Sequence, residues 1–348
     1  MTELIRNNRI MTIIVNALLL LIYTVLTIIS VCGRNTITSQ QEAERFRDGN
    51  KAYSQVSAFI SQDQVVGLEE LNNVRNSLMQ MLVEDSYYDT NGNGRVWADT
   101  YSSEKSVEIS NDRSSLNVTA VGIGGDFFLF HPMRLLAGGY ISESDLNHDR
   151  IVVDKNFAWN MFGSFDIVGM QVWIGNNIYY VSGVVDVDDD SVSEIAYGQS
   201  DRIYMYWDKL KELQDDLYIT CYEAVLPEPI TNYAFYALQS AFGLYEKMEN
   251  ADGKKDMLCF DNVEVIENTN RYNRLHLLRN FKVWKYNNMR VNNISYPFWE
   301  NIARVKEMEQ TIYLFLRLIV LFFLSIRILF VIKSTLEVVL DKLTTKKK

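Results

Sequence analysis

The sequence predicts an α+β domain held between two membrane-spanning helices. Residues 10–32 and 310–332 are each 23 residues long and strongly apolar, which is the length of a helix that crosses a bilayer. Between them, short β-branched runs alternate with stretches of helical periodicity, and no other long apolar run remains. The formal net charge is −10 overall but −16 within residues 33–310, so the acidic residues are concentrated between the two apolar segments.

Basic residues set the predicted orientation of the chain. Arg6 and Arg9 precede the first apolar segment, and residues 346–348 are all lysine. Because Lys and Arg favour the cytoplasmic side of a membrane, both termini are predicted to be cytoplasmic. The predicted organisation is a cytoplasmic N-terminus (1–9), two spans (10–32 and 310–332), an extracellular domain with stalk helices (33–309) and a basic cytoplasmic tail (333–348).

Two arginines interrupt the second apolar segment. Arg317 and Arg327 are costly within hydrocarbon, but each lies within seven residues of one end and can extend toward the nearer interface. The alternative is that one of them contacts an acid or carbonyl group on a partner span. The first segment contains a single strongly polar side chain, Asn16. A cleaved signal peptide is the alternative for that segment, although no A-x-A site follows it.

Residues 121–186 contain a succession of short motifs. Asp126 precedes Phe127 and Phe128, and it is expected to cap a short apolar helix or turn. Residues 135–139 read LLAGG and are expected to end that element, because glycine tolerates the positive φ of a sharp turn.

The next motif predicts a strand, a helix and a hairpin in that order. Residues 151–153 are β-branched and predict a buried strand, after which Asp154 is expected to cap a helix that ends at Gly163. That helix is expected to bury four side chains, those of Phe157, Ala158, Met161 and Phe162. Apolar positions alternate on both sides of residues 175–177, which predicts a hairpin whose second strand continues through residues 181–185.

The rest of the middle region is expected to mix strands with amphipathic helices. Scattered apolar positions in residues 34–60 predict a helix that continues the first span outward as a stalk. Further helices are expected at residues 68–83 and 231–244, and strands within residues 96–121, 202–207, 218–226 and 263–266.

The sequence carries no recognisable catalytic or cofactor-binding constellation. His131, His148 and His276 belong to no HExxH motif, and no G-x-S-x-G elbow or phosphate-binding loop occurs. Residues 89–94 and the acidic run 186–190 are interpreted as a turn and a solvated loop, because a cation site needs ligands at other spacings. The net negative charge argues against a nucleic-acid partner. We therefore expect no enzyme activity, no cofactor and no metal site.

Two of the three cysteines form a candidate disulfide. Cys32 lies at the edge of the first apolar segment, whereas Cys221 and Cys259 lie in the middle region. If that region is extracellular, these two can form a bond, and two buried free thiols are the alternative.

The motifs in residues 121–186 together resemble the periplasmic core domain of MacB-like, FtsX-type ABC transporter permeases. Members of that family share a DYF turn, an LLAGR segment, a strand with a following helix that ends in LFG, a VG pair before a hairpin, and a VVGVV-type strand. Residues 295–304, SYPFWENIAR, resemble the segment that precedes the second membrane helix in permeases of this type from Gram-positive bacteria.

The resemblance implies an α+β extracellular domain of two subdomains, with mixed sheets and packed helices. It also implies a non-catalytic cell-membrane subunit that couples a separate cytoplasmic ABC ATPase to the extracellular domain. Partners would be that ATPase and either a second permease chain or a second copy of this chain. The matching positions are fold-forming glycines and apolar residues, so the resemblance assigns no binding residues, and Arg317 and Arg327 are the candidate partner contacts.

The number of spans departs from the family pattern. Such permeases usually have four spans, and two are predicted here, so a shortened or split permease that acts beside a fuller one is expected. The alternative is a two-span cell-surface sensor or binding protein without an ATPase partner.

Overall fold

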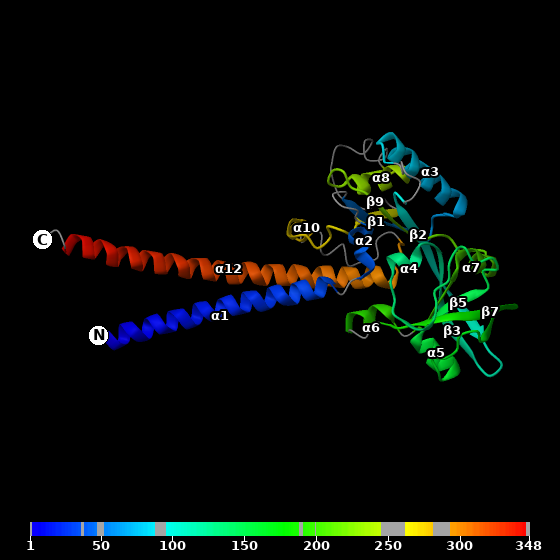
Figure 1. The fold of residues 1–348 in the computed structure, drawn as a ribbon, viewed down its shortest axis with the longest axis horizontal. Helices are drawn as coiled ribbons and strands as arrows, with labels where there is room; N and C mark the ends of the chain where they lie inside the picture. Colours follow the sequence, from blue (N-terminus) through cyan, green and yellow to red (C-terminus); the bar gives the residue numbers. More distant parts are fainter. Residues whose placement is uncertain are drawn as a thin grey trace. The chain divides into compact units, whose positions relative to one another are not determined.

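The computed structural model describes residues 2–35, 38–46, 52–87, 95–187, 191–198, 200–244, 262–280 and 293–345. The chain divides into two compact units (Figure 1). We call Met1–Thr36, Tyr272–Trp284 and Val305–Lys348 the helical unit, and Ile37–Arg271 with Lys285–Arg304 the sheet unit.

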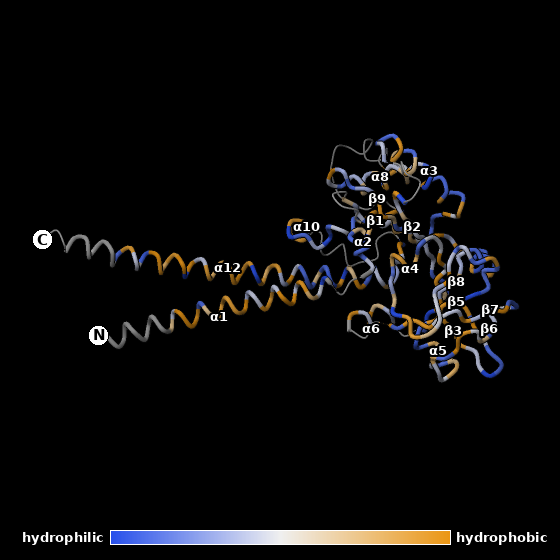
Figure 2. The backbone as a smooth tube through the Cα atoms, in the orientation of Figure 1, coloured by the Kyte–Doolittle hydropathy of each residue, from blue (hydrophilic) through white to orange (hydrophobic). Residues whose placement is uncertain are grey.

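The helical unit is built from α1 (Thr2–Asn35), α10 (Arg274–Asn280) and all but the first turns of α12 (Phe298–Thr345). Two helical stretches, Met11–Arg34 and Phe298–Glu337, are long and apolar enough to cross a membrane. Hydrophobic residues run along α1 and α12 (Figure 2), and many of their side chains are exposed, as expected for helices that face lipid. Ser30 donates a 2.5 Å hydrogen bond to Gln310, whose amide donates back to the Ser30 carbonyl at 3.1 Å.

One ten-stranded mixed sheet runs through the sheet unit. Its strand order is β10-β1-β9-β2-β3-β8-β5-β7-β4, and β6 pairs with β2 and β7 beside this path. The β3–β8 and β5–β7 pairs are parallel and the other pairs are antiparallel. The strand bounds are β1 Tyr53–Ile60, β2 Ala98–Ser110, β3 Ser115–Gly125, β4 Leu135–Gly138, β5 Arg150–Asp154, β6 Gln171–Ile174, β7 Asn177–Val185, β8 Arg202–Tyr206, β9 Cys221–Pro227 and β10 Val263–Glu267.

Helices pack on the sheet in two lobes (Figure 1). In one lobe α2 and α8 pack on β1, β9 and β10, and α3 packs on α8. In the other lobe α5 and α7 pack on β3, β5, β7 and β8. The helix bounds are η1 Thr38–Gln40, α2 Glu42–Phe46, α3 Leu68–Glu84, α4 Phe127–Phe130, α5 Lys155–Phe162, α6 Ser191–Tyr197, α7 Trp207–Leu213 and α8 Tyr233–Ala241. The predicted α+β class, with helices packed on a mixed sheet, is confirmed, and the long strands β2 and β3 carry the one sheet from one lobe to the other.

The predicted strand–helix–hairpin motif is present as β5, α5, β6 and β7. Asp154 Oδ1 accepts the backbone N–H of Phe157 at 2.7 Å, and Gly163 ends α5 with a φ of 67°. Three of the four side chains expected to be buried are buried, whereas Phe162 is half-buried at the edge of the core. The second carboxylate oxygen of Asp154 accepts the backbone N–H of Arg202 at 2.7 Å, so the helix cap also holds β8.

The prediction of a stalk helix at residues 34–60 is wrong. The helix α1 ends at Asn35, and β1 lies inside the sheet between β9 and β10. Seven of the eight positions of β1 are buried, on both faces of the sheet. A strand covered on both sides does not alternate apolar and polar residues, which is why its sequence lacked the strand pattern.

Two local expectations near α4 also need correction. The Asp126 side chain does not cap α4; it forms a 2.6 Å ion pair with Arg95. The LLAGG segment is not only a turn, because Leu135–Gly138 forms β4 and pairs with β7. Gly138 does have the expected positive φ, at 70°, and a Cβ there would meet the Ser182 carbonyl.

The remaining helices and strands predicted in the middle region are present with small shifts in their bounds. Three features discussed above lie outside the described residues: the predicted turn at residues 89–94, Cys259 and most of the acidic run 186–190. Asp186 itself forms an ion pair with Lys155 at 2.8 Å and another with Arg134. Its carboxylate is thus paired with bases.

Candidate functional site: the junction at the start of α12

The sheet unit contains a buried set of charged side chains where α12 begins. Pro297 precedes the helix, and its carbonyl accepts the backbone N–H groups of Glu300 and Asn301, both at 3.1 Å. Glu300 lies in the first turn, where a carboxylate is favoured by the helix dipole. The local sequence therefore fixes both the start of α12 and the place of its first acidic side chain.

Arg271 and Glu300 form the centre of this set. Two guanidinium nitrogens of Arg271 donate to the two carboxylate oxygens of Glu300 at 2.7 and 2.9 Å. Each side chain is only 2% exposed. A bidentate pair of this geometry is strong and directional, and removal of one partner would leave a buried charge uncompensated.

Arg304 extends the set toward the edge strand β10. Its Nε donates to Glu300 at 2.7 Å, and a terminal nitrogen lies 2.8 Å from Glu264. The guanidinium also lies over the ring of Tyr296, whose hydroxyl donates to Glu264. Burial by itself lowers the pKa of Arg304, but the carboxylates of Glu300 and Glu264 outweigh it and raise the pKa above its ordinary value. We call Glu264, Arg271, Tyr296, Glu300 and Arg304 the junction cluster.

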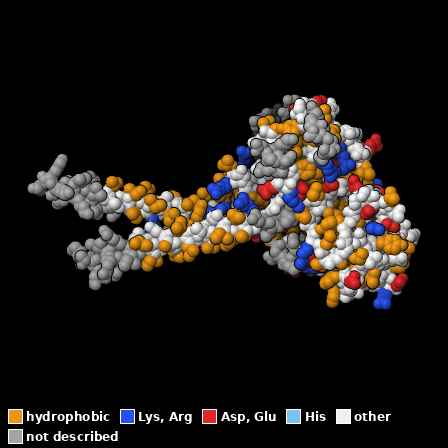
Figure 3. All heavy atoms as spheres, in the orientation of Figure 1, with side chains coloured by type: hydrophobic (Ala, Val, Ile, Leu, Met, Phe, Trp, Pro, Cys, Tyr) orange, Lys and Arg blue, Asp and Glu red, His pale blue; other side chains and the backbone are white. Residues whose placement is uncertain are grey.

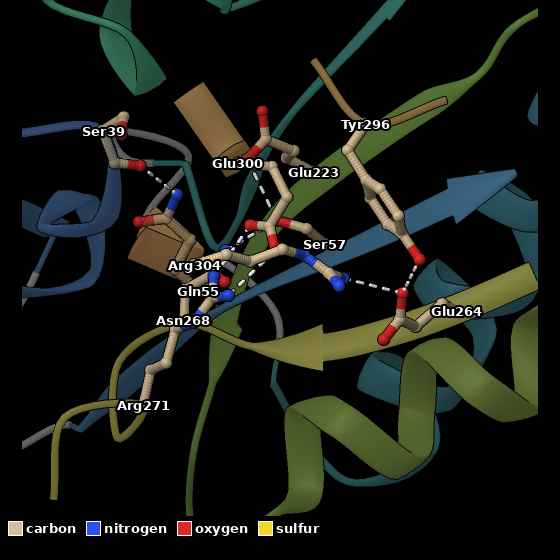
Figure 4. A network of polar contacts seen from close by, with 10 residues as sticks. All are labelled: Ser39, Gln55, Ser57, Glu223, Glu264, Asn268, Arg271, Tyr296, Glu300 and Arg304. Atoms are coloured by element: carbon tan, nitrogen blue, oxygen red, sulfur yellow. Dashed lines mark hydrogen bonds and ion pairs between the residues drawn. The ribbon is translucent and has the colours of Figure 1, made fainter. Parts of the chain in front are cut away.

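A second chain of polar side chains crosses β1 and β9 beside the junction cluster (Figure 4). Asn268 donates to Ser57 of β1 at 2.6 Å, and Ser57 donates to Glu223 of β9 at 2.9 Å. The other oxygen of Glu223 lies 2.6 Å from His131 Nε2, and both side chains are buried. The His131 ring lies 4.4 Å from that of Trp299, the second residue of α12.

The first residues of α12 also contact the other lobe. The ring of Phe298 lies 4.7 Å from that of Tyr197 in α6, and the guanidinium of Arg202 in β8 lies over both rings. Trp299 belongs to the hydrophobic cluster that also contains Phe127. The start of α12 is therefore held by ion pairs on one lobe and by aromatic packing on the other.

The sequence-predicted contact residues lie elsewhere, in the helical unit. Arg327 Nε donates to Asn16 of α1 at 2.7 Å, and Arg317 Nε donates to the carbonyl of Tyr313 in its own helix at 3.2 Å. Cys221 is buried in β9, and its bond to Cys259 stays a prediction. Burial raises the pKa of the Cys221 thiol well above its ordinary value, so the thiol stays protonated at neutral pH.

Sequence reasoning did not identify the junction cluster. Glu300 and Arg304 are four residues apart, a spacing that signals a helical ion pair. Their buried partner Arg271 lies 29 residues before Glu300, and nothing local marks it. Among the described residues, no group of three or more His, Cys, Asp and Glu side chains is placed to hold a metal ion.

Comparison with known proteins identifies the family. The model of the MacB-like periplasmic core domain matches residues 25–232, which is more than half of the chain. The macrolide export ATP-binding/permease protein MacB of Chromobacterium violaceum is 31% identical over 96 residues. That stretch is 27% of this chain and 15% of the relative, so the match spans a small part of the relative's length.

Two solved structures that align with this chain do so at low sequence identity. The periplasmic region of MacB from Actinobacillus actinomycetemcomitans aligns with 16% identity and a TM-score of 0.40, over 62% of this chain and 89% of the other. The extracellular domain of the noncanonic ABC-type transporter YknZ from Gram-positive bacteria aligns with 15% identity and a TM-score of 0.39, over 61% and 99%. On the strength of the family match, this chain belongs to the family of proteins with a MacB-like periplasmic core domain, a domain of ABC transporter permeases.

Proposed function

We propose that the chain is a non-catalytic membrane subunit of an FtsX/MacB-type system and couples a cytoplasmic ATPase to its extracellular domain. The supporting observation is the bidentate pair between Arg271 and Glu300, which anchors the first turn of α12 inside the sheet unit. The same helix continues without a break through an apolar stretch of membrane-spanning length. A movement of α12 in the membrane would then be transmitted to the extracellular domain.

The proposed arrangement places both termini in the cytoplasm and the region between the spans outside. The basic ends of the chain and the −16 charge of residues 33–310 support this orientation. An ATP-binding-cassette subunit would bind the cytoplasmic side, together with a second permease chain or a second copy of this chain. Arg317 and Arg327 are the proposed contact residues for such a partner within the membrane.

Co-purification from native membranes tests the partner. The full chain, tagged at its C-terminus and extracted in mild detergent, should bring an ATP-binding-cassette subunit with it. An otherwise intact preparation that never contains such a subunit would contradict the proposal and favour a two-span cell-surface sensor or binding protein.

Spin-label distances test the coupling in the purified complex in nanodiscs. Labels at Leu146→Cys in the sheet unit and Leu318→Cys in α12 should show a distance distribution that changes when ATP is added. The R271M variant should keep the ATPase subunit but lose that change, because α12 is no longer anchored at its start. The matched control is K209M, which removes the exposed Lys209–Glu212 pair on α7 and should respond like the native chain.

A further inference from the structure

The short helix α10 of the helical unit exposes two leucines between two arginines. Leu277 is buried, whereas Leu275 is 74% exposed and Leu278 is 40% exposed. Helix positions three and four residues apart share a face, so Leu275 and Leu278 project together, with Arg279 beside the first and Arg274 beside the second. The exposed face of α10 is therefore apolar at its centre and basic at both ends.

The two arginines of α10 have no acidic partner among the described residues. Within the part of the chain that the structure describes, neither Arg274 nor Arg279 forms an ion pair with a carboxylate. Residues 272–280 contain no Asp or Glu, although residues 33–310 as a whole carry −16. A basic segment inside such an acidic region indicates an anionic partner from outside the chain.

The place of α10 in the fold indicates what that partner is. The helix belongs to the same compact unit as the two membrane-length helices. The positive charges of Arg274 and of Arg34, in the last turn of α1, both act on Arg317 of α12. Positive charge is thus gathered near the end of the apolar stretch of α1, where phosphate headgroups meet a spanning helix. Figure 3 shows many hydrophobic side chains along the described parts of the two long helices.

We propose that α10 is an interfacial helix that docks on the outer leaflet of the membrane. Leu275 and Leu278 enter the boundary between headgroups and acyl chains, while Arg274 and Arg279 bind the phosphates of anionic phospholipids. The inference rests on one part of the proposed function, that α1 and α12 cross the bilayer with the sheet unit outside. It does not depend on an ATPase partner, so the two proposals can fail separately.

Lipid quenching tests the apolar contact in the full chain in nanodiscs. A single cysteine at Leu278→Cys, in a chain whose three native cysteines are replaced, carries an environment-sensitive fluorophore. Phospholipid with a nitroxide near the headgroup should quench this label strongly. The control label at Leu146→Cys, where the native side chain is 99% exposed in the sheet unit, should be quenched much less. Equal quenching at the two positions would overturn the proposal.

Lipid selectivity tests the proposed contact of Arg274 and Arg279 with lipid phosphates. Spin-labelled phosphatidylglycerol should bind the native chain in preference to phosphatidylcholine, and added salt should weaken the preference. Each arginine at a membrane surface contributes about a fivefold preference for anionic lipid. The preference of R274Q/R279Q for phosphatidylglycerol should therefore be lower than that of the native chain by more than about tenfold. The control R113Q/R150Q changes two exposed arginines of the sheet unit and should keep it. An unchanged preference in R274Q/R279Q would contradict the proposed phosphate contact.

Discussion

Arg327 of α12 donates a 2.7 Å hydrogen bond from Nε to Oδ1 of Asn16 in α1. Asn16 is the only amide or charged side chain in residues 10–32, so the polar group of one apolar segment meets an arginine of the other. The second link, between Ser30 and Gln310, joins the other ends of the same stretches, which makes the two helices antiparallel. The structure thus gives Arg327 a partner on α1 of the same chain, and contact with a further chain stays a prediction.

Replacement of Asn16 should weaken the helix pair. In N16L, Arg327 loses its acceptor, and hydrogen bonds between membrane helices are worth roughly 0.5–2 kcal/mol. We expect a corresponding loss in stability when the full chain is unfolded in mixed micelles with increasing SDS. The control T27V removes a hydroxyl that donates to the Tyr23 carbonyl of its own helix, and it should leave the transition in place. Equal transitions for N16L and the native chain would mean that the Asn16–Arg327 bond contributes nothing.

Disruption of the junction cluster should be strongly destabilising. In the soluble fragment 33–309, which we expect to fold cooperatively, R271M leaves Glu300 buried beside Arg304 alone. Breaking a buried pair by removing one partner costs about 3–5 kcal/mol, so denaturant unfolding should shift by that amount. The double variant R271M/E300M should cost less than the sum of its single variants, because no charge of the pair stays uncompensated.

The control for the junction cluster is K209M, in an exposed pair that should contribute less than about 1 kcal/mol. A similarly small effect of R271M would show that Arg271 is not needed to hold the start of α12. An aggregated or unfolded fragment would show that the boundaries at 33 and 309 are wrong.

Replacement of the two phenylalanines of α5 by alanine should lower the free energy of unfolding by different amounts. Phe157 is fully buried in the main core, so F157A should lower the free energy of unfolding of the fragment by about 3–5 kcal/mol. Phe162 lies at the edge of that core and is half-buried, so F162A should cost distinctly less. The same denaturant titration measures both. Equal losses would mean that Phe162 is covered as completely as Phe157.

Asp154 should make stability depend on pH in a defined window. Burial raises the pKa of Asp154 to about 6 in the folded chain, from an ordinary value of 3.8, even though two backbone N–H groups favour its charged form. Between these values the folded chain holds a proton that the unfolded chain has released. The contribution of Asp154 to stability is therefore complete below the unfolded pKa and is lost as the pH rises through the folded pKa.

The D154N variant isolates this effect, because asparagine can still cap α5 but does not titrate. Relative to D154N, the native fragment should lose up to about 3 kcal/mol between pH 4 and pH 7. The asparagine can also lower the free energy of unfolding by a fixed amount, for example through the lost bond to the Arg202 backbone. That amount does not vary with pH, so it does not affect the change in the difference between the two proteins. A difference between the two proteins that does not change with pH would exclude a raised pKa at Asp154.

Cysteine accessibility on intact cells should establish the orientation of the chain. Single cysteines at Asn8, Asp188 and Thr345 are introduced into a chain without its native cysteines. Only Asp188→Cys should react with an impermeant maleimide, since both ends are expected in the cytoplasm. The mature protein should retain Met1 or Thr2 by mass. Labelling at Thr345→Cys would mean that the second segment does not cross the membrane, and a mature chain beginning near Cys32 would leave a single span.

The sequence by itself determined the elements whose causes are local. Two uncharged or nearly uncharged runs of membrane length predicted both long helices, because hydrophobic length is a property of the run itself. Asp154 and Gly163 marked the ends of α5, since a cap bonds to a backbone group only a few residues away. The family was also recognisable, because its motifs follow one another within residues 121–186.

Only the tertiary structure decided which distant segments meet. The strand β1 was mistaken for a helix because both of its faces are covered, and pattern reasoning depends on one face being exposed to water. Arg271 and Glu300, and Asn16 and Arg327, find each other across 29 and 311 residues. A charged or amide side chain in the sequence shows that it needs a partner. Which partner it receives is settled by the packing that removes both groups from water, because burial makes an unpaired group too costly to keep.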